Sequence, residues 1–462
     1  MSDYDPNLRR IRRIVATVVG LLFLIPVGGV IAIVSWRVRL SHSVERELAA
    51  IRAAGLPTDG EELNSWYVTP PDSQNAALVI TQAFALMRDF PDVRSNKIRD
   101  VLMGRAKPLD DENRKMVAEY VAMNGPALEK AQQVMELPKS RFPLDLSMGE
   151  SLLLPHLPKL KTLAQAAGFK AMLAADAGRA NDAAVSLETG LAFARSLDSE
   201  PTMISQLVRV STLTIISADL QSCLDSGGFD DAKLVELSAA FASAEKTNLM
   251  ARALIGERAM HIPYFHMSRA QIDRFISSDE NGEGPLGRPL PGKEPGMLRV
   301  TGFFQRDLDF FLKTMARGIA EAAKGPPESL RQTNLFDDAT ELAARRYYIW
   351  SAMFLPVMGR VTQREANGLA RIRSARAALA VERFRLANGR LPGTLDELVP
   401  KYLDSVPMDP FDGAPLRYRL RDKGYVIYSV DRDGHDDGGR ERPANWKSTD
   451  RSTYDIPLTV ER

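Results

Sequence analysis

The chain contains a single cysteine, Cys223, among its 462 residues. One thiol excludes an intramolecular disulfide and any zinc site built from several cysteines. Cys223 lies in the apolar stretch between Ile215 and Leu224. Because a free cysteine in such surroundings packs as a small hydrophobic residue, we expect it to be a buried structural thiol.

An excess of basic charge is also absent, since 60 Lys and Arg residues are balanced by 59 Asp and Glu residues, for a net charge of +1. Nucleic-acid binding needs a basic excess that displaces counterions from phosphates, so nucleic acid is not an expected partner. The hydrophobic content of 45% is that of a globular protein and argues against wholesale disorder. The length is sufficient for two or three domains.

Several motifs that mark catalytic or cofactor sites are missing, namely the Gly-x-Ser-x-Gly elbow, the P-loop and the dinucleotide-binding glycine pattern. The remaining catalytic candidate is the cluster of Glu257, His261 and His266. Glu257 and His261 share one face of a helix, which is a metal-ligand spacing. Pro263 interrupts that helix, so we expect a packed face with a Glu–His hydrogen bond and no enzyme activity. The alternative is an extracytoplasmic metal-dependent hydrolase that uses these three residues.

A long uncharged run near the N-terminus extends from Ile14 to Trp36. About 20 apolar residues cross the hydrocarbon layer of a bilayer, so the run predicts a transmembrane helix. Arginines are more numerous before the run than after it, which favours a cytoplasmic N-terminus and an extracytoplasmic body. The alternative is a signal peptide cleaved near Val30–Ala32. Because the run is longer than a signal-peptide core, we expect an uncleaved single-pass anchor.

From residue 41 to residue 355 the pattern is almost entirely helical, with apolar residues at three- and four-residue spacing. This predicts an α-helical extracytoplasmic domain. Residues 277–296 interrupt it with nine Gly or Pro residues in twenty, a composition that predicts an exposed loop.

A weak internal repeat lies within this region, because Asp176–Ala183 returns as Asp225–Ala232 forty-nine residues later. In each copy a helix reaches a glycine that serves as its C-cap, and an Asn/Asp pair then opens the next helix. Each copy therefore predicts a helical hairpin. The segment Ala171–Arg195 resembles a tetratricopeptide-type hairpin, but the repeat is longer than in that family and most aromatic signature positions are missing. We expect two stacked hairpins and not a regular solenoid.

The last unit, residues 361–462, changes from helical to strand patterning. A helix is expected at Val361–Ala387, followed by a short helix at Thr394–Val399. Leu416–Leu420 alternates as a strand, and a tight turn leads to a second strand at Tyr425–Val430. The pattern predicts a small α+β domain.

Several motifs follow one another in this unit: Asn388–Pro392, Asp409–Phe411, Tyr428-Ser429, an acidic loop at Asp431–Gly439, and Asp455-Ile456. In this order they resemble the C-terminal domain of the major pseudopilin (protein G) of type II secretion systems. No pseudopilin processing site precedes the N-terminal apolar run, and phenylalanine at 411 replaces the family's tryptophan. The resemblance therefore implies a pilin-like domain used outside a fibre.

The acidic loop predicts a calcium site, because Ca²⁺ takes six to eight oxygen ligands and closely spaced Asp and Gly residues let carboxylates and carbonyls converge. The resemblance implies carboxylates from Asp433 and Asp455, with carbonyl or hydroxyl groups from around Ser429, Val430 and His435. The calcium would be structural, since it would close a long loop. The bland alternative is a solvated acidic turn. The complete candidate ligand set is Asp433, Asp455, Asp431, Asp436, Asp437, Ser429 and Val430.

The sequence as a whole predicts a mainly α protein in three parts. Residues 1–40 form a cytoplasmic tail and transmembrane anchor, residues 41–355 a helical ectodomain, and residues 361–462 a pseudopilin-like domain. The expected location is the bacterial inner membrane, with the bulk of the chain periplasmic. The expected function is that of a non-enzymatic scaffold whose partners are envelope or secretion-machinery proteins, bound through helical grooves or a sheet edge.

Overall fold

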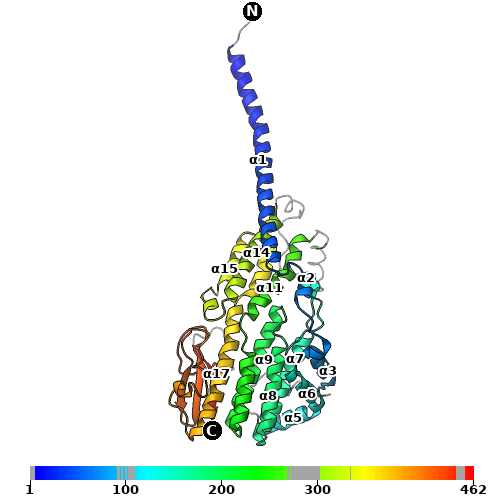
Figure 1. Ribbon diagram of the computed structural model, residues 1–462. Coiled ribbons are helices and arrows are strands. Elements are labelled where there is room, and N and C mark those ends of the chain that lie inside the picture. Colours follow the sequence, from blue (N-terminus) through cyan, green and yellow to red (C-terminus); the bar gives the residue numbers. More distant parts are fainter. Residues whose placement is uncertain are drawn as a thin grey trace, which may run out of the picture.

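The computed structural model describes residues 6–90, 94, 97–98, 101, 110–267, 271, 302–332, 334–443 and 453–462. They form a mainly helical body from which helix α1 projects (Figure 1). A small antiparallel sheet lies at the C-terminal end of the chain, so the predicted mainly α class with a small C-terminal α+β unit is confirmed. The predicted loop at 277–296 lies outside the described residues.

The described α-helices are α1 (Pro6–Ala53), α2 (Gly60–Trp66), α3 (Ala76–Leu86), α5 (Asp111–Met123), α6 (Gly125–Gln132), α7 (His156–Asp176), α8 (Ala180–Arg195), α9 (Met203–Ser226), α10 (Asp231–Ala244), α11 (Leu249–His261), α14 (Phe303–Ala322), α15 (Leu335–Arg345), α16 (Ile349–Phe354) and α17 (Val361–Asn388). The 3-10 helices are η1 (Asp72–Gln74), η2 (Gln133–Glu136), η3 (Leu146–Ser151), η4 (Ile262–His266), η5 (Glu328–Gln332), η6 (Leu355–Met358) and η7 (Leu395–Leu398). The strands are β1 (Arg417–Arg421), β2 (Gly424–Ser429) and β3 (Ile456–Glu461).

The helix pairs predicted as hairpins are α7–α8 and α9–α10. The first hairpin is confirmed, because α7 and α8 pack on each other. In the second pair the prediction was wrong, because α10 follows α9 in the chain but packs mainly on α8 and α17. Gly178 and Gly227 follow the first helix of each pair with φ of 69° and 74°, the left-handed conformation that lets a glycine end a helix. Asp230 caps α10 by accepting a hydrogen bond from the Lys233 amide at 2.8 Å. In the first hairpin the helix begins earlier, at Ala180, so the Asn/Asp pair lies inside its first turn and does not cap it.

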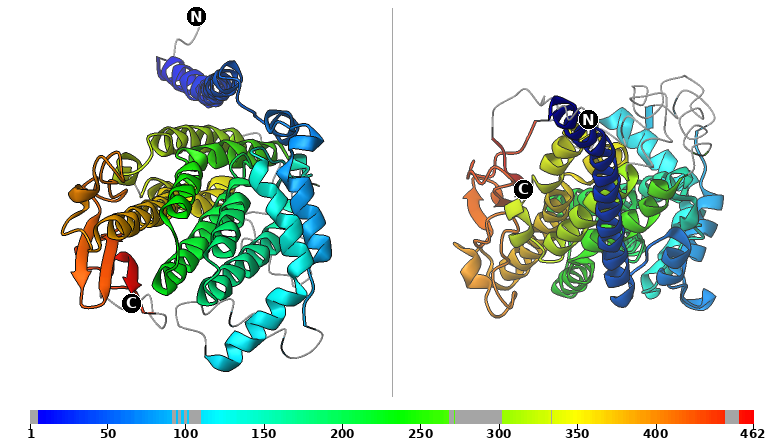
Figure 2. Two further views of the ribbon diagram at one scale, coloured as in Figure 1. Left: turned by 60° about the horizontal axis from the view of Figure 1, so that its bottom comes forward. Right: turned by 90° about the horizontal axis from the view of Figure 1, so that it is seen from above.

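The C-terminal helix α17 packs along α9 and α10, and the sheet covers the other side of α17 (Figure 1). One hydrophobic core runs through the hairpins and the C-terminal unit without a break, and its members include Leu220, Phe241, Leu379 and Ile427. The predicted domain boundary at residue 361 therefore falls between elements that share a single core. The sheet lies at one side of the hairpins, and α3, α5 and α6 lie at the opposite side (Figure 2).

The sheet has the order β1-β2-β3 and is antiparallel throughout. The first two strands were expected from the sequence, whereas β3 was not. β3 is fixed to α9 as well as to β2, since the Thr459 amide donates to Gln221 Oε1 at 3.1 Å and the Glu461 amide donates to Asp225 Oδ1 at 2.8 Å. These bonds tie the end of the chain to a helix more than two hundred residues earlier.

Helix α1 continues without interruption from Pro6 to Ala53, so the expected anchor and the start of the expected helical domain form one helix. Its last turns pack on α14, where Val44 and Ile51 are buried and Ser43 Oγ donates to Asp309 Oδ1 at 2.7 Å. Among the described residues one helix, α9, is long and apolar enough to cross a bilayer, and 61% of its apolar segment is buried. α9 occupies the middle of the bundle, which accounts for its apolar character (Figure 2).

Candidate functional site

The acidic loop is anchored by Asp409, a fully buried carboxylate to which the sequence analysis gave no role. Its oxygens accept hydrogen bonds from Ser429 Oγ at 2.8 Å and from the Val430 amide at 3.0 Å. Arg417 Nη1 adds an ion pair at 2.7 Å. A buried carboxylate is stable only when it is paired and hydrogen-bonded, and Asp409 meets that condition. Ser429 and Val430 thus hold the start of the loop on Asp409.

Three of the expected calcium ligands are engaged with separate partners. Asp431 accepts from Arg442 Nη2 at 3.2 Å, and burial raises the pKa of its carboxyl. Asp433 is exposed and accepts the amide of His435 at 3.0 Å, which is the geometry of a local turn. Asp436 accepts the Tyr428 hydroxyl at 2.9 Å. These carboxylates do not converge on one point.

Asp437 and Asp455 are the pair that the loop does bring together. Asp437 Oδ1 accepts from Thr453 Oγ1 at 2.9 Å, and Asp455 Oδ2 accepts from the Gly439 amide at 2.7 Å. The second oxygen of each carboxylate is buried and has no hydrogen-bond partner within the described residues. Burial and then the charge of Asp437 raise the pKa of Asp455. Two desolvated carboxylate oxygens without donors are the local chemistry that a hard cation such as Ca²⁺ satisfies.

No cluster of three or more His, Cys, Asp or Glu side chains suited to a metal occurs in the described part of the chain. A calcium ion at Asp437 and Asp455 would therefore need backbone carbonyl or water oxygens to complete its coordination. The calcium site stays a prediction. Within the set of expected ligands, the unpartnered oxygens favour Asp437 and Asp455 over Asp433 and Asp431.

The expected hydrolase cluster is only partly assembled. His261 is surrounded by aromatic and acidic side chains. Its Nε2 is hydrogen-bonded to Glu150 Oε1, and its Nδ1 lies 4.0 Å from Glu257 Oε2. Its ring stacks on Phe354 at a centroid distance of 4.0 Å. Glu257 also accepts the Met203 amide at 2.7 Å, and burial raises its pKa. The expected packed helix face is therefore present, but the expected hydrogen bond between Glu257 and His261 is not, because His261 pairs with Glu150 instead.

His266 does not join that pair. It follows Pro263 on η4 and lines a separate cavity of about 440 Å³ together with Arg52 and Thr58, beside the end of α1. Burial lowers the pKa of His266, as expected for a cation taken out of water. Glu257, His261 and His266 therefore do not converge on one metal.

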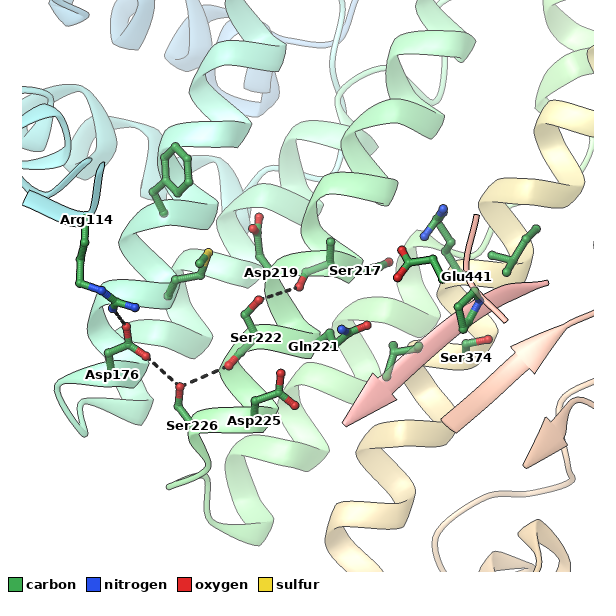
Figure 3. Close-up of a pocket in the computed structure, with 17 residues that line it drawn as sticks. Arg114, Asp176, Ser217, Asp219, Gln221, Ser222, Asp225, Ser226, Ser374 and Glu441 are labelled. Carbon is green, nitrogen blue, oxygen red and sulfur yellow. Dashed lines mark hydrogen bonds and ion pairs between the residues drawn. The ribbon is translucent and has the colours of Figure 1, made fainter. Parts of the chain in front are cut away.

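A second cavity, which the sequence analysis did not anticipate, lies between the hairpins and the C-terminal unit (Figure 3). Its volume is about 370 Å³. Asp176 on α7 and the residues Asp219 and Asp225 on α9 line one wall, and Ser374 on α17 and Glu441 line the other (Figure 3). It is within the size range of ligand pockets, which span roughly 300–1,000 Å³.

The cavity wall depends on a close approach of α7 to α9. A methyl group at Gly168 of α7 would lie 1.8 Å from Asp219 Oδ2, so only glycine allows the two helices to meet there. Burial raises the pKa of Asp225 to about 6, although the hydrogen bond from the Glu461 amide lowers it. Burial, followed by the charges of Asp219, Asp176 and Asp225, also raises the pKa of the Cys223 thiol. Cys223 is fully buried, as expected.

Comparison with known proteins finds no matching family model, no matching curated protein and no matching solved structure. The resemblances to the pseudopilin domain and to a tetratricopeptide-type hairpin therefore stay predictions. The function is inferred below from the geometry of the chain alone.

Proposed function

We propose that the protein is a single-pass membrane protein whose body lies outside the cytoplasm and acts by binding other envelope proteins, without catalysis. The observation that carries the proposal is the apolar surface of α1. Val15, Ile31 and Val34 are 54%, 59% and 54% exposed, although they stand on a helix that projects away from the body (Figure 1). Further exposed apolar side chains on the same helix are Val18, Val27, Ile33 and Val38.

Apolar surface of this extent is unfavourable in water, and a lipid bilayer would cover it on all sides of the helix. The 48 residues of α1 span about 72 Å, so the helix can cross a hydrocarbon layer of about 30 Å and still reach the body. Trp36 suits the interface between lipid and water, and its ring lies 5.3 Å from the guanidinium carbon of Arg306 on α14.

The same helix would hold the body in a fixed position close to the membrane. Val44 and Ile51 pack into the core around α11 and α14, so no flexible linker separates the proposed anchor from the body. A scaffold that presents a binding surface at a set height benefits from such a rigid connection, because less entropy is lost when a partner binds. We favour this role over the alternative hydrolase because His266 lines a separate cavity and does not meet Glu257 and His261.

The binding surface we favour is the outer edge of the sheet. β1 pairs only with β2 within the sheet, so its other edge can accept an added strand. Leu420 on β1 is 54% exposed, which is unusual for a large apolar side chain on an edge strand.

Topology can be tested through the single cysteine. In a Cys223→Ala background, a cysteine is placed at Leu153, which is 80% exposed on the body, or at Ser2 before the apolar run. A membrane-impermeant maleimide should label the Leu153 position once the outer membrane is opened, and the Ser2 position only after lysis. The reverse pattern, or release of both variants in soluble form, would refute the proposal.

Partner binding is tested separately with a photo-crosslinking residue at Leu420, and at the more exposed Leu153 as a control. Discrete protein adducts at Leu420 that are missing at Leu153 support the edge as a binding surface. Equal adducts at both positions, or none at either, would contradict it.

A further inference from the structure

The cavity beneath β3 carries polar groups that the fold itself does not use. The hydroxyl oxygens of Ser217 on α9 and Ser374 on α17 have no hydrogen-bond partner among the described residues. Both side chains line the cavity and are 5% and 1% exposed. A serine inside a helix ordinarily donates to the carbonyl one turn earlier, as Ser222 does to Ala218 at 3.3 Å. Two buried hydroxyls without partners, from two different elements, indicate that something else meets them.

The net charge of the residues that line the cavity indicates whether the ligand is a cation or an anion. The cavity is lined by four carboxylates and two guanidiniums, so its lining carries an excess of two negative charges. The acidic residues are Asp176, Asp219, Asp225 and Glu441, and the basic residues are Arg114 and Arg371.

Both arginines already have acidic neighbours. Arg114 forms an ion pair with Asp176 at the rim. Arg371 is half-buried, and burial lowers the pKa of its guanidinium while the charges of Glu441 and Asp431 oppose that shift. An anionic ligand would have to compete with those acids inside a low-dielectric space, where like charges repel strongly. A cationic ligand would share the carboxylates with these arginines, and the net negative charge of the lining favours it over an anion.

We propose that this cavity is a binding site for a small organic ammonium compound, held by the aspartates of α7 and α9 and by the hydroxyls of Ser217 and Ser374. A volume of about 370 Å³ admits a short diamine. Ammonium groups supply donors to carboxylates and hydroxyls alike, and such charge-assisted hydrogen bonds are the strong ones. Neither calcium nor a membrane is required, so the site is independent of the proposed function.

The placement of the site gives binding a structural consequence. The cavity is closed by β3, which is bonded to Gln221 and Asp225 of α9, and by Glu441, which is bridged to Asp455. A ligand that joins α9 to these segments would stabilise the contact between the hairpins and the C-terminal unit.

The experiment uses the full chain in detergent and two probes of equal length, 1,5-diaminopentane and 1,5-pentanediol, in calorimetric titrations with a calcium chelator present. The diamine should bind with one-to-one stoichiometry and the diol should not. Asp219→Asn should weaken diamine binding about tenfold or more, because it removes a buried charge from the lining. Glu341→Gln, which changes an exposed acid on α15, should leave binding unchanged.

A second variant protects the test against misfolding. Ser217→Ala removes only a hydroxyl without a partner, so its melting temperature should match the parent while diamine affinity falls severalfold. Equal binding of diamine and diol, or a diamine affinity that Asp219→Asn and Glu341→Gln lower alike, would overturn the proposal. Unchanged diamine affinity in a folded Ser217→Ala variant would also overturn the proposal, because the two serine hydroxyls would then be hydrogen-bonded by water and not by the ligand.

Discussion

Glu365 offers the sharpest test of how α17 is joined to the bundle. This carboxyl lies on α17, is 5% exposed and faces Arg209 and the start of α11. Burial raises its pKa from 4.5 to about 7, while the charge of Arg209 and the amides of Asn248, Leu249 and Met250 oppose the shift. The charged form is thus disfavoured in the folded state.

The sign of the pH effect follows from that shift. Because the unfolded pKa is lower than the folded one, the unfolded chain loses its proton first, and stability falls as pH rises from 4.5 to about 7. A shift of this size corresponds to about 3 kcal/mol of destabilisation well above pH 7 and to less than about 1 kcal/mol at pH 5. Glu365→Gln removes the charge with little change in shape. The stability of this variant relative to the parent, measured as the difference in free energy of unfolding, should be about 2–3 kcal/mol greater at pH 8.5 than at pH 5.

The assay is urea unfolding of the full chain in detergent at both pH values, followed by tryptophan fluorescence. Glu382→Gln is the matched control, since Glu382 is equally buried on the same helix but accepts from Arg385 Nε at 2.8 Å and from Arg462 Nη2 at 2.8 Å. Loss of those charge-assisted bonds should destabilise by about 1.5–3 kcal/mol at either pH. A pH-independent effect of Glu365→Gln would refute the reasoning, because α17 would then not be buried against the hairpins.

Three further predictions concern the candidate sites. In thermal melts, calcium at one hundred times its Kd should stabilise the full chain by about 2.7 kcal/mol relative to the same sample with a chelator. This gain should be lost in Asp455→Asn and kept in Asp433→Asn. The opposite result would place the calcium at Asp433. Gly168→Ala should cost about 1–3 kcal/mol in urea unfolding because its methyl group meets Asp219, and Gly125→Ala, with open space around it, should not; equal effects would contradict the close approach. Replacing His261 by alanine should destabilise the fold without changing metal content, and stoichiometric zinc lost with that change would revive the hydrolase.

The sequence was a good guide wherever local chemistry decides the structure. The glycines at 178 and 227 mark helix ends because only a residue without a side chain adopts their left-handed conformation easily. The alternation around Tyr418 and the apolar run after Gly424 predicted β1 and β2, although β2 is buried on both faces and β1 is mostly exposed. In the first hairpin the Asn/Asp pair misled the placement of the helix start, since Arg179 precedes Ala180 without capping it through its side chain.

Features that depend on distant partners could not be predicted in the same way. β3 has a proline and a short alternation, and it becomes a strand because β2 and the acceptors on α9 fix its amides. One feature of the sequence does indicate the cavity, because Asp219, Ser222 and Ser226 recur at helical spacing along the otherwise apolar α9. Such a polar stripe on a buried helix indicates a polar contact, but not which element supplies it.

The acidic loop illustrates why composition alone misplaces a metal site. Seven positions looked equivalent as oxygen ligands, yet the side chains of four of them already have hydrogen-bond partners: Ser429 with Asp409, Asp431 with Arg442, Asp433 with the His435 amide and Asp436 with Tyr428. Val430 could offer only its carbonyl oxygen, and its amide is held by Asp409. A carboxylate that is satisfied by protein donors gains little from a cation, because it must give up those bonds to bind one. Only an oxygen that folding has dehydrated and left without a donor gains the full benefit of coordination. The second oxygens of Asp437 and Asp455 are in that state within the described chain, which is why we place the calcium there.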